Sequence, residues 1–382
     1  MGFAAAMSEH PLATHAVGET VGAILDQIGP SPDLAVVFVT GAFAGATEDV
    51  AHAVNEMLQP MAFIGATAVS VLAGRREVEE QPAVVLFAAN WSGRLRTSAK
   101  VIRFEAEREG DAWRLTGTDA VGSDGTLILL ADPFSFPVDS FIGELHRRSP
   151  GLTVVGGMAS AASGPGGNRL VAGSETVTRG AVGIHLPAGV PVRAVVSQGC
   201  RPVGEPLVVT EATGNLIAEI AGRRALDRIT ETADEADPQD RALMAQGLQV
   251  GLVLDERLET FGAGDFLVRN VLGADRSTGA VAVGADVAVG TTVQFQVRDA
   301  DSADADLRSS LAGRGGQAAL VFTCNGRGTR LFGDAHHDAT VVSDHLDGGA
   351  VAGMFCAGEI GPVDGQPFVH GFSTSVLLFD DR

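Results

Sequence analysis

Residues 351–354 read Val-Ala-Gly-Met and residues 155–158 read Val-Gly-Gly-Met, and both stretches occupy the same place in a run of predicted elements. A buried strand comes first, then a helix, then the apolar stretch with its glycine, and finally a Gly-rich loop and a closing strand. About 25 to 29 residues lead from the end of the first strand to the glycine, which is enough for a helical crossover between parallel strands. The pattern predicts a repeated strand-helix-strand-strand unit.

Three copies of this unit follow one another along the chain. Each is given as first strand, helix, glycine-containing segment and closing strand: 34–40, 49–58, 61–66 and 83–88; 127–131, 139–147, 152–157 and 180–186; 318–324, 338–346, 350–355 and 372–379. We therefore predict an α/β fold (α+β, with mixed sheets) of two domains built from such units. The alternative is that the copies only reflect the alternation found in any α/β chain.

The segments between the copies carry further predictions. Residues 101–107 and 112–117 are typical of a hairpin, in which we single out no chemistry. Residues 197–206, with two glycines and two prolines, predict a shaped loop between two strands, and the acidic residues 232–241 predict a flexible connection. Residues 299–306 hold four aspartates but lack the glycine and terminal glutamate of a calcium-binding EF-hand loop, so they indicate the start of a solvated helix.

The composition excludes several classes of function. The 382 residues carry a net charge of −20, from 27 basic and 47 acidic side chains, and this disfavours binding to nucleic acid or to an anionic membrane surface. Charged residues and glycines interrupt every apolar run before the roughly 20 residues of a membrane-spanning helix. The start of the chain lacks the pattern of a secretory signal, so we expect a cytoplasmic protein. Three widely spaced cysteines are typical of reduced thiols.

Four motifs gather polar chemistry where strands end. They are residues 197–206, residues 324–328, residues 355–362 and residues 370–374. In a layered α/β protein, ligands collect at strand ends, where Gly-rich turns expose backbone N–H groups. Arg201 and Arg327 are suited to a carboxylate or phosphate, and Glu205 and Glu359 to an ammonium group or to pairing with the arginines. The predicted ligand-binding residues are Gln198, Cys200, Arg201, Glu205, Cys324, Asn325, Arg327, Cys356, Glu359 and His370. The alternative is that these charges satisfy one another without a ligand.

The same motifs resemble the FIST family, the F-box and intracellular signal transduction domains. The resemblance rests on SQGCRPVGEP from residue 197, the following LVVTEATGNLIAEIAGRRALDRI, CNGRG, FCAGEIGP and HGFST. It implies a FIST N-like domain at 32–222 and a FIST C-like domain at 223–382, after an N-terminal extension of 31 residues. It also implies sensing of a small ligand such as an amino acid. From the placement of the four motifs we expect this ligand to bind where the two domains join. We find no attached kinase, cyclase, receiver or F-box segment, so we expect any output either to pass through a downstream signalling protein or to be absent.

Other readings stay open. A Cys324 or Cys200 nucleophile with His370 as base would make a cysteine-dependent hydrolase or transferase, and a non-catalytic interaction scaffold is a further alternative. Metal binding by Cys324, Cys356 and His370, or by residues 336–338, lacks the usual ligand spacing, so we predict no metal and no cofactor. The sequence names neither the ligand nor the oligomeric state.

Overall fold

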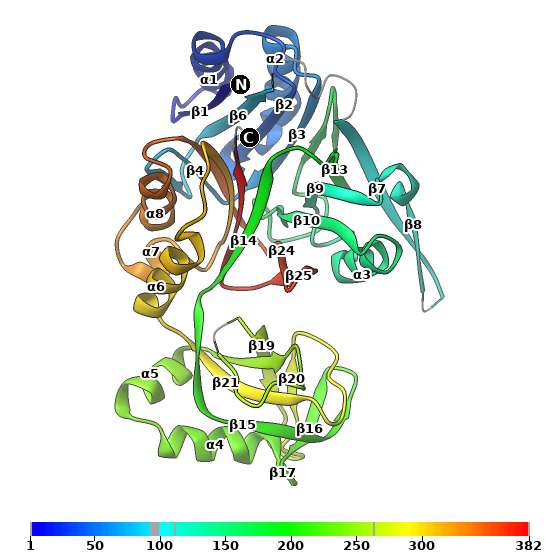
Figure 1. Ribbon diagram of the computed structural model, residues 1–382, viewed down its shortest axis with the longest axis vertical. Helices are drawn as coiled ribbons and strands as arrows, with labels where there is room; N and C mark the ends of the chain where they lie inside the picture. The colour runs from blue at the N-terminus through cyan, green and yellow to red at the C-terminus, as the bar shows by residue number, and fades with distance from the viewer. Residues whose placement is uncertain (1, 92–98, 111, 263, 381–382) are drawn as a thin grey trace. The chain divides into compact units, whose positions relative to one another are not determined.

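The computed structural model describes residues 2–91, 99–110, 112–262 and 264–380. These residues form helices and four sheets, which confirms the predicted α/β class with mixed sheets (Figure 1). Three of the sheets combine parallel and antiparallel pairs, and the fourth is antiparallel. Spatial contacts divide the chain into two compact units. Unit 1 comprises residues 1–196, 308–369 and 374–382, and unit 2 comprises residues 197–307 and 370–373. This partition follows contacts within the fold, so the sequence-based division at residues 222 and 223 stays a prediction.

Unit 1 contains three modules of the predicted strand-helix-strand-strand type. The first is β2 (Leu34–Thr40), α2 (Thr47–Leu58), β3 (Ala62–Ala68) and β6 (Val84–Asn90); the second is β9 (Asp124–Ala131), α3 (Val138–Arg148), β10 (Gly151–Met158) and β13 (Ala181–Leu186); the third is β22 (Ala318–Cys324), α8 (His337–His345), β23 (Ala350–Cys356) and β26 (Ser373–Phe379). In every module the first strand pairs in parallel with the middle strand and antiparallel with the closing strand. The repeat is therefore a repeat of topology as well as of element order.

Each sheet is completed by a leading strand and by a hairpin borrowed from another module. The leading strands β1 (Gly2–Ser8), β7 (Lys100–Glu109) and β14 (Val192–Gln198) pair with the closing strands. The hairpin β11–β12 (Leu170–Ala172, Glu175–Val177) joins the first module, β24–β25 (Glu359–Val363, Gln366–His370) the second, and β4–β5 (Ser70–Ala73, Arg76–Glu79) the third. The modules thus exchange hairpins in a cycle, which ties the three sheets into one body.

A glycine at the same place in each middle strand allows this packing. A Cβ on Gly65 would lie 2.5 Å from the Val37 carbonyl oxygen. The corresponding distances are 1.8 Å from Gly156 to Leu129 and 2.1 Å from Gly353 to Val321. Backbone cannot move away as a flexible side chain can, so only glycine fits. All three lie in the glycine-containing segments that marked the repeat in the sequence. The strand register makes Gly156 the equivalent of Gly353, one residue before the match that the Val-Gly-Gly-Met stretch suggests.

Alternate residues of the first strands meet in one central core. It includes Phe38 of β2, Leu130 of β9 and Phe322 of β22, all fully buried, and the rings of Phe38 and Phe322 meet edge to face at 6.1 Å. The remaining faces are covered by helices. Helices α1 (Ala13–Ile28) and α2 lie on the sheet of the first module (Figure 1), and α3 packs on the second.

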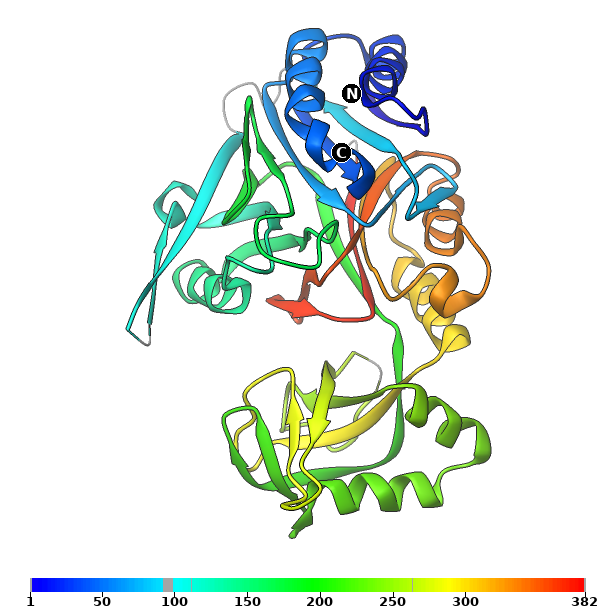
Figure 2. The same ribbon diagram turned by 180° about the vertical axis from the view of Figure 1, so that it is seen from behind.

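Unit 2 is a closed sheet with two helices. Its order is β15 (Cys200–Thr213), β21 (Thr292–Arg298), β18 (Leu248–Val253), β19 (Phe266–Ala274), β20 (Val281–Val283), β16 (Leu216–Ile220) and β17 (Arg223–Arg224), and an additional pairing of β15 with β16 closes the barrel. Helices α4 (Ala225–Glu235) and α5 (Pro238–Gln246) lie along one side of it (Figure 2). The chain leaves this sheet into α6 (Ala300–Leu311), which confirms the helix start predicted at residues 299–306.

Two predictions for this region were wrong. Residues 197–206 are not a loop, because β14 and β15 run through them with only Gly199 between the strands. The pairing of β15 with β21 shifts register between Val203 and Leu207, and Gly204 there has φ +72°, so the glycine serves a β-bulge. Residues 232–241 are not a flexible connection. Asp237 caps α5 by accepting from the N–H groups of Gln239 and Asp240, and Pro238 fits its first turn.

Candidate functional site

A buried charged cluster lies at the ends of β22 and β23 in unit 1. We call Cys324, Arg327, Asp338, Cys356 and Glu359 the third-module cluster. Arg327 and Glu359 are fully buried and Asp338 is 1% exposed. The Arg327 guanidinium donates to both Asp338 oxygens, with Nε–Oδ2 and Nη2–Oδ1 distances of 2.8 Å. This is the two-pronged geometry that arginine favours with carboxylates, so the arginine is already committed to a protein carboxylate.

Other side chains converge on the same carboxylate. The hydroxyls of Thr323 and Thr374 donate to Asp338 Oδ2 at 2.5 and 3.1 Å, and His337 Nδ1 lies 3.0 Å from Oδ1. Burial alone would raise the pKa of Asp338, but the charge and hydrogen bonds of Arg327 outweigh it and hold that pKa well below its usual range. Burial alone would lower the pKa of Arg327, because it disfavours the charged guanidinium. The charge and hydrogen bonds of Asp338 outweigh this effect and raise the pKa of Arg327 above its usual value. The pair is ionised and belongs to the interior of the fold.

The two cysteines of the cluster differ in surroundings. Cys356 is fully buried, and burial, followed by the charges of Glu359 and Cys324, raises its pKa well above the usual value. Cys324 is 6% exposed, and its Sγ accepts from the Gly326 N–H at 3.4 Å. A raised pKa makes Cys356 a poor nucleophile. The neighbouring Asn325 is exposed.

The other predicted site residues belong to unit 2. Arg201 pairs there with Asp240 and, at 3.3 Å, with Asp299. Gln198 donates from Nε2 to the Phe266 carbonyl oxygen at 3.0 Å. The remaining members of the predicted set in this unit are Cys200, which is half-buried, Glu205, which is exposed, and His370, which is buried. The structure thus brings Cys324, Arg327, Cys356 and Glu359 together in unit 1. Ligand binding by any member of the predicted set stays a prediction.

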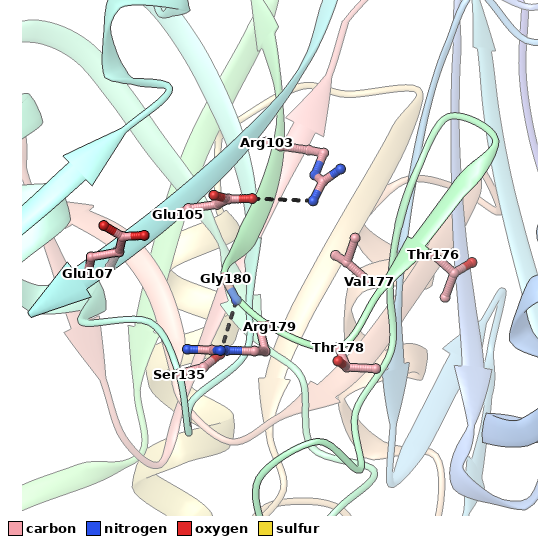
Figure 3. A pocket seen from close by; sticks show the side chains of 10 residues that line it. Arg103, Glu105, Glu107, Ser135, Thr176, Val177, Thr178, Arg179 and Gly180 are labelled. Carbon is pink, nitrogen blue, oxygen red and sulfur yellow. Dashed lines mark hydrogen bonds and ion pairs between the residues drawn. The ribbon is translucent and has the colours of Figure 1, made fainter.

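A cavity of about 410 Å³ lies elsewhere in unit 1, beside β7 and the hairpin β11–β12 (Figure 3). Its lining includes two guanidinium groups, two carboxylates and three hydroxyl groups, from Arg103, Glu105, Glu107, Ser135, Thr176, Thr178 and Arg179. Arg103 pairs with Glu175 at 2.6 Å and with Glu105 at 3.4 Å. Arg179 is exposed and makes no salt bridge within the described part of the chain. The cavity therefore offers both signs of charge to one small molecule.

Ser135 has a fixed hydrogen-bonding role in this cavity. Its hydroxyl donates to Asp132 Oδ2 at 2.6 Å and accepts from the Gly180 N–H at 3.0 Å. Asp132 is fully buried and also accepts from Asn168 Nδ2 at 2.9 Å, which holds the carboxylate in place. The single hydroxyl proton is used, so Ser135 has only a lone pair left for a ligand. It would receive an N–H or O–H group.

A second cavity of about 700 Å³ shares part of this lining. Glu107, Ser135, Thr178 and Arg179 border both cavities. The second adds two aromatic side chains, Trp113 at 39% and Phe134 at 42% exposure. The Arg108 guanidinium lies 5.8 Å from the centre of the Trp113 ring. Charged and aromatic surfaces thus lie next to each other.

The sequence analysis missed these cavity residues. It identified the hairpin of β7 and β8 (Ala112–Thr116) correctly but assigned it no chemistry. A signal was present, because Arg103, Glu105 and Glu107 alternate with more buried residues and so share the solvent face of β7. The partner side chains Ser135 and Arg179 come from the loops after β9 and β12, and no local pattern connects them to β7.

Within residues 2–91, 99–110, 112–262 and 264–380, no cluster of three or more His, Cys, Asp or Glu side chains is arranged to hold a metal ion. His336 instead accepts at Nδ1 from the Glu77 N–H at 3.0 Å. No helix in the described part of the chain is long and apolar enough to span a bilayer.

Comparison with known proteins gives two domain matches and several relatives. The FIST N domain family matches residues 33–223, and the FIST C domain family matches residues 223–362. Uncharacterized protein Mb0898c of Mycobacterium bovis is 44% identical over 383 residues, which cover 97% of each chain. Uncharacterized protein MT0656 of Mycobacterium tuberculosis is 43% identical over 361 residues, which cover 92% of each chain.

Proposed function

This chain belongs to the FIST family, and we propose that it is a sensory protein that binds a small metabolite with both a carboxylate and an ammonium group, such as an amino acid. The observation that carries the proposal is the cavity of about 410 Å³ with guanidinium and carboxylate groups in one lining. In this proposal a signalling partner reads out the bound state. The proposed kind of ligand is the one expected from the sequence. The proposed binding site differs, because it is the cavity in unit 1 and not the place where the four motifs were expected to meet.

Arg179 is the group best suited to the ligand carboxylate. It borders the cavity, and within the described residues it has no salt bridge to give up. A guanidinium can hold a carboxylate through two parallel hydrogen bonds. Arg327 and Arg201 are poorer choices, because a ligand would have to displace Asp338 from the first, or Asp240 and Asp299 from the second.

The ammonium group would lie toward Glu105 and Ser135. The existing partner of Glu105 is Arg103, and that pair is exposed, with side-chain exposures of 63% and 44%. Exposed salt bridges contribute only about 0–1 kcal/mol, so a ligand ammonium can compete for the carboxylate at small cost. The lone pair of Ser135 adds an acceptor of fixed direction. An apolar side chain of the ligand would extend toward Trp113 and Phe134 in the adjoining cavity.

A thermal-shift screen of amino acids and central metabolites tests the proposal. A ligand at a hundredfold excess over its Kd stabilises the protein by about 2.7 kcal/mol, and we expect a midpoint rise of roughly 5–10 °C. Arg179→Ala should abolish most of the rise. Arg276→Ala is the matched control, because Arg276 is also exposed, belongs to unit 2 and is not among the residues that line this cavity.

Two outcomes would contradict the proposal. One is that no metabolite raises the midpoint of the wild-type protein. The other is that Arg179→Ala keeps the full rise, and if Arg201→Ala then loses it, the site predicted from the sequence is the better assignment.

A further inference from the structure

Cys324 and Cys356 end neighbouring parallel strands and lie opposite each other. They are the last register pair between β22 and β23. The even-numbered residues before them, among them Phe322 and Met354, point into the same central core. Because side chains alternate along a strand, both thiols point to that face. Adjacent strands are about 4.8 Å apart, which lies within the Cα separation of about 4.4–6.8 Å that a disulfide needs. Both residues are thiols in this structure.

A glycine of the second module makes room for one of the two sulfur atoms. A Cβ on Gly157 would lie 2.3 Å from Cys356 Sγ and 3.2 Å from its Cβ. The Cys356 thiol therefore occupies the space where a side chain at position 157 would lie. No other residue fits in place of Gly157 unless this thiol moves.

Only the third module has two thiols at these places. In the third module Gly353 is paired in register with Val321, and Cys324 and Cys356 lie three residues after this pair. The same step leads to Thr40 and Ala68 in the first module. In the second it leads to Asp132 and Ala159, just beyond the end of the strand pairing. The repeat itself does not require sulfur here, which points to a chemical use.

The two thiols are suited to different steps of one reaction. The Cys324 sulfur accepts an N–H hydrogen bond from Gly326 at 3.4 Å, and when the thiol ionises its charge interacts with the Arg327 guanidinium. Both contacts stabilise the thiolate, whereas the contact of the neutral thiol with Asn325 Oδ1, at 3.8 Å, is lost on ionisation. Cys356 instead donates to the Met354 carbonyl oxygen at 3.6 Å and is fully buried, so it stays a neutral thiol. Cys324 is also the more exposed of the two, and a small oxidant would reach it first.

We propose that Cys324 and Cys356 form a redox-active dithiol that a hydroperoxide converts to an intramolecular disulfide. The Cys324 thiolate attacks one peroxide oxygen, the O–O bond breaks, and the leaving oxygen takes a proton to give an alcohol, or water when hydrogen peroxide is used. Cys324 is then a sulfenic acid. The Cys356 sulfur loses its proton and attacks Cys324, the S–O bond breaks, and the released hydroxide takes that proton to give water. The two sulfur atoms together lose two electrons, and the peroxide gains them.

Mass spectrometry of the full-length protein tests this assignment. Fully reduced protein is treated with hydrogen peroxide, quenched, alkylated under denaturing conditions and digested. We expect a linked peptide pair that contains Cys324 and Cys356, loss of two alkylation sites, and recovery of both after dithiothreitol. Cys200→Ser should give the same disulfide, because Cys200 lies in unit 2.

A second variant separates the two steps. In Cys356→Ser the reaction should stop at the Cys324 sulfenic acid, which dimedone traps, and circular dichroism checks that the variant is folded. Three results would overturn the proposal: a disulfide that includes Cys200, oxidation of Cys324 in the wild type only to sulfinic or sulfonic acid, or no oxidation of either cysteine while the protein is folded. The wild-type result stands even where a variant does not fold.

Discussion

Asp338→Asn tests the buried pair at the centre of the third-module cluster. The change removes the charge of Asp338 while it keeps the shape of the side chain, so the fully buried guanidinium of Arg327 loses the carboxylate that it holds through two hydrogen bonds. Removing one partner of a buried salt bridge costs about 3–5 kcal/mol, because the remaining charge stays out of water. Thr323 and Thr374 also lose a charged acceptor, so we expect the upper part of that range. The melting midpoint should fall by roughly 6–20 °C.

Urea unfolding of three variants provides the assay. Asp338→Asn should lose about 3–5 kcal/mol of unfolding free energy. The triple variant Arg327→Met/Asp338→Leu/Glu359→Leu should recover more than half of the loss, because it replaces all three buried charges of the cluster by apolar side chains, which costs little. Glu144→Gln is the control, because its exposed pair with Arg147 contributes only about 0–1 kcal/mol. If Asp338→Asn lies within about 1 kcal/mol of the wild type, the pair is not the buried, committed ion pair described here.

Three further predictions follow from single contacts. Gly157→Ala should lower the unfolding free energy, measured with urea, by about 1–3 kcal/mol, and by less in a Cys356→Gly background. An equal loss in both backgrounds would show that the new methyl group does not clash with the Cys356 sulfur. Burial, followed by the charge of Asp338, raises the pKa of Glu77 from 4.5 to about 7. Because the folded protein holds this proton more tightly than the unfolded chain, Glu77 contributes its full stability below about pH 4. That contribution is lost as the pH rises toward 7. Glu77→Gln should flatten this slope in a pH series of unfolding, and an unchanged slope would assign it to another group. Trp113→Ala should weaken binding of large apolar amino acids severalfold in calorimetry and leave glycine binding unchanged, whereas equal effects on both would remove the adjoining cavity from the site.

The three-module architecture could be predicted from the sequence because its causes are local. Each first strand is a continuous apolar run, and Gly65, Gly156 and Gly353 are required by close backbone contacts, so both signals recur at a fixed spacing. The exchange of hairpins could not be predicted. The short strands β4 and β11 pair with strands far away in the chain, and their few residues carry no mark of which partner they choose.

The site was predicted less completely for a related reason. Arg327 was singled out from its motif, but its partner Asp338 was read only as part of a helix start and of an unlikely metal site, because nothing local links them. The prolines and glycines of residues 197–206 indicated a loop, whereas β15 runs through most of them: Pro202 pairs with Gln296 of β21, and Gly204 and Pro206 lie in the bulge. Arg179 and Glu105 meet only after β13 brings β7 and the loop after β12 together.

The most direct test of the proposed function is a crystal structure of the protein with the metabolite that gives the largest thermal shift. The account predicts electron density for the ligand in the cavity of Figure 3, with its carboxylate on the Arg179 guanidinium and its ammonium group toward Glu105 and Ser135. Density for the same ligand beside Arg201 or Arg327, with the Figure 3 cavity holding only solvent, would contradict it.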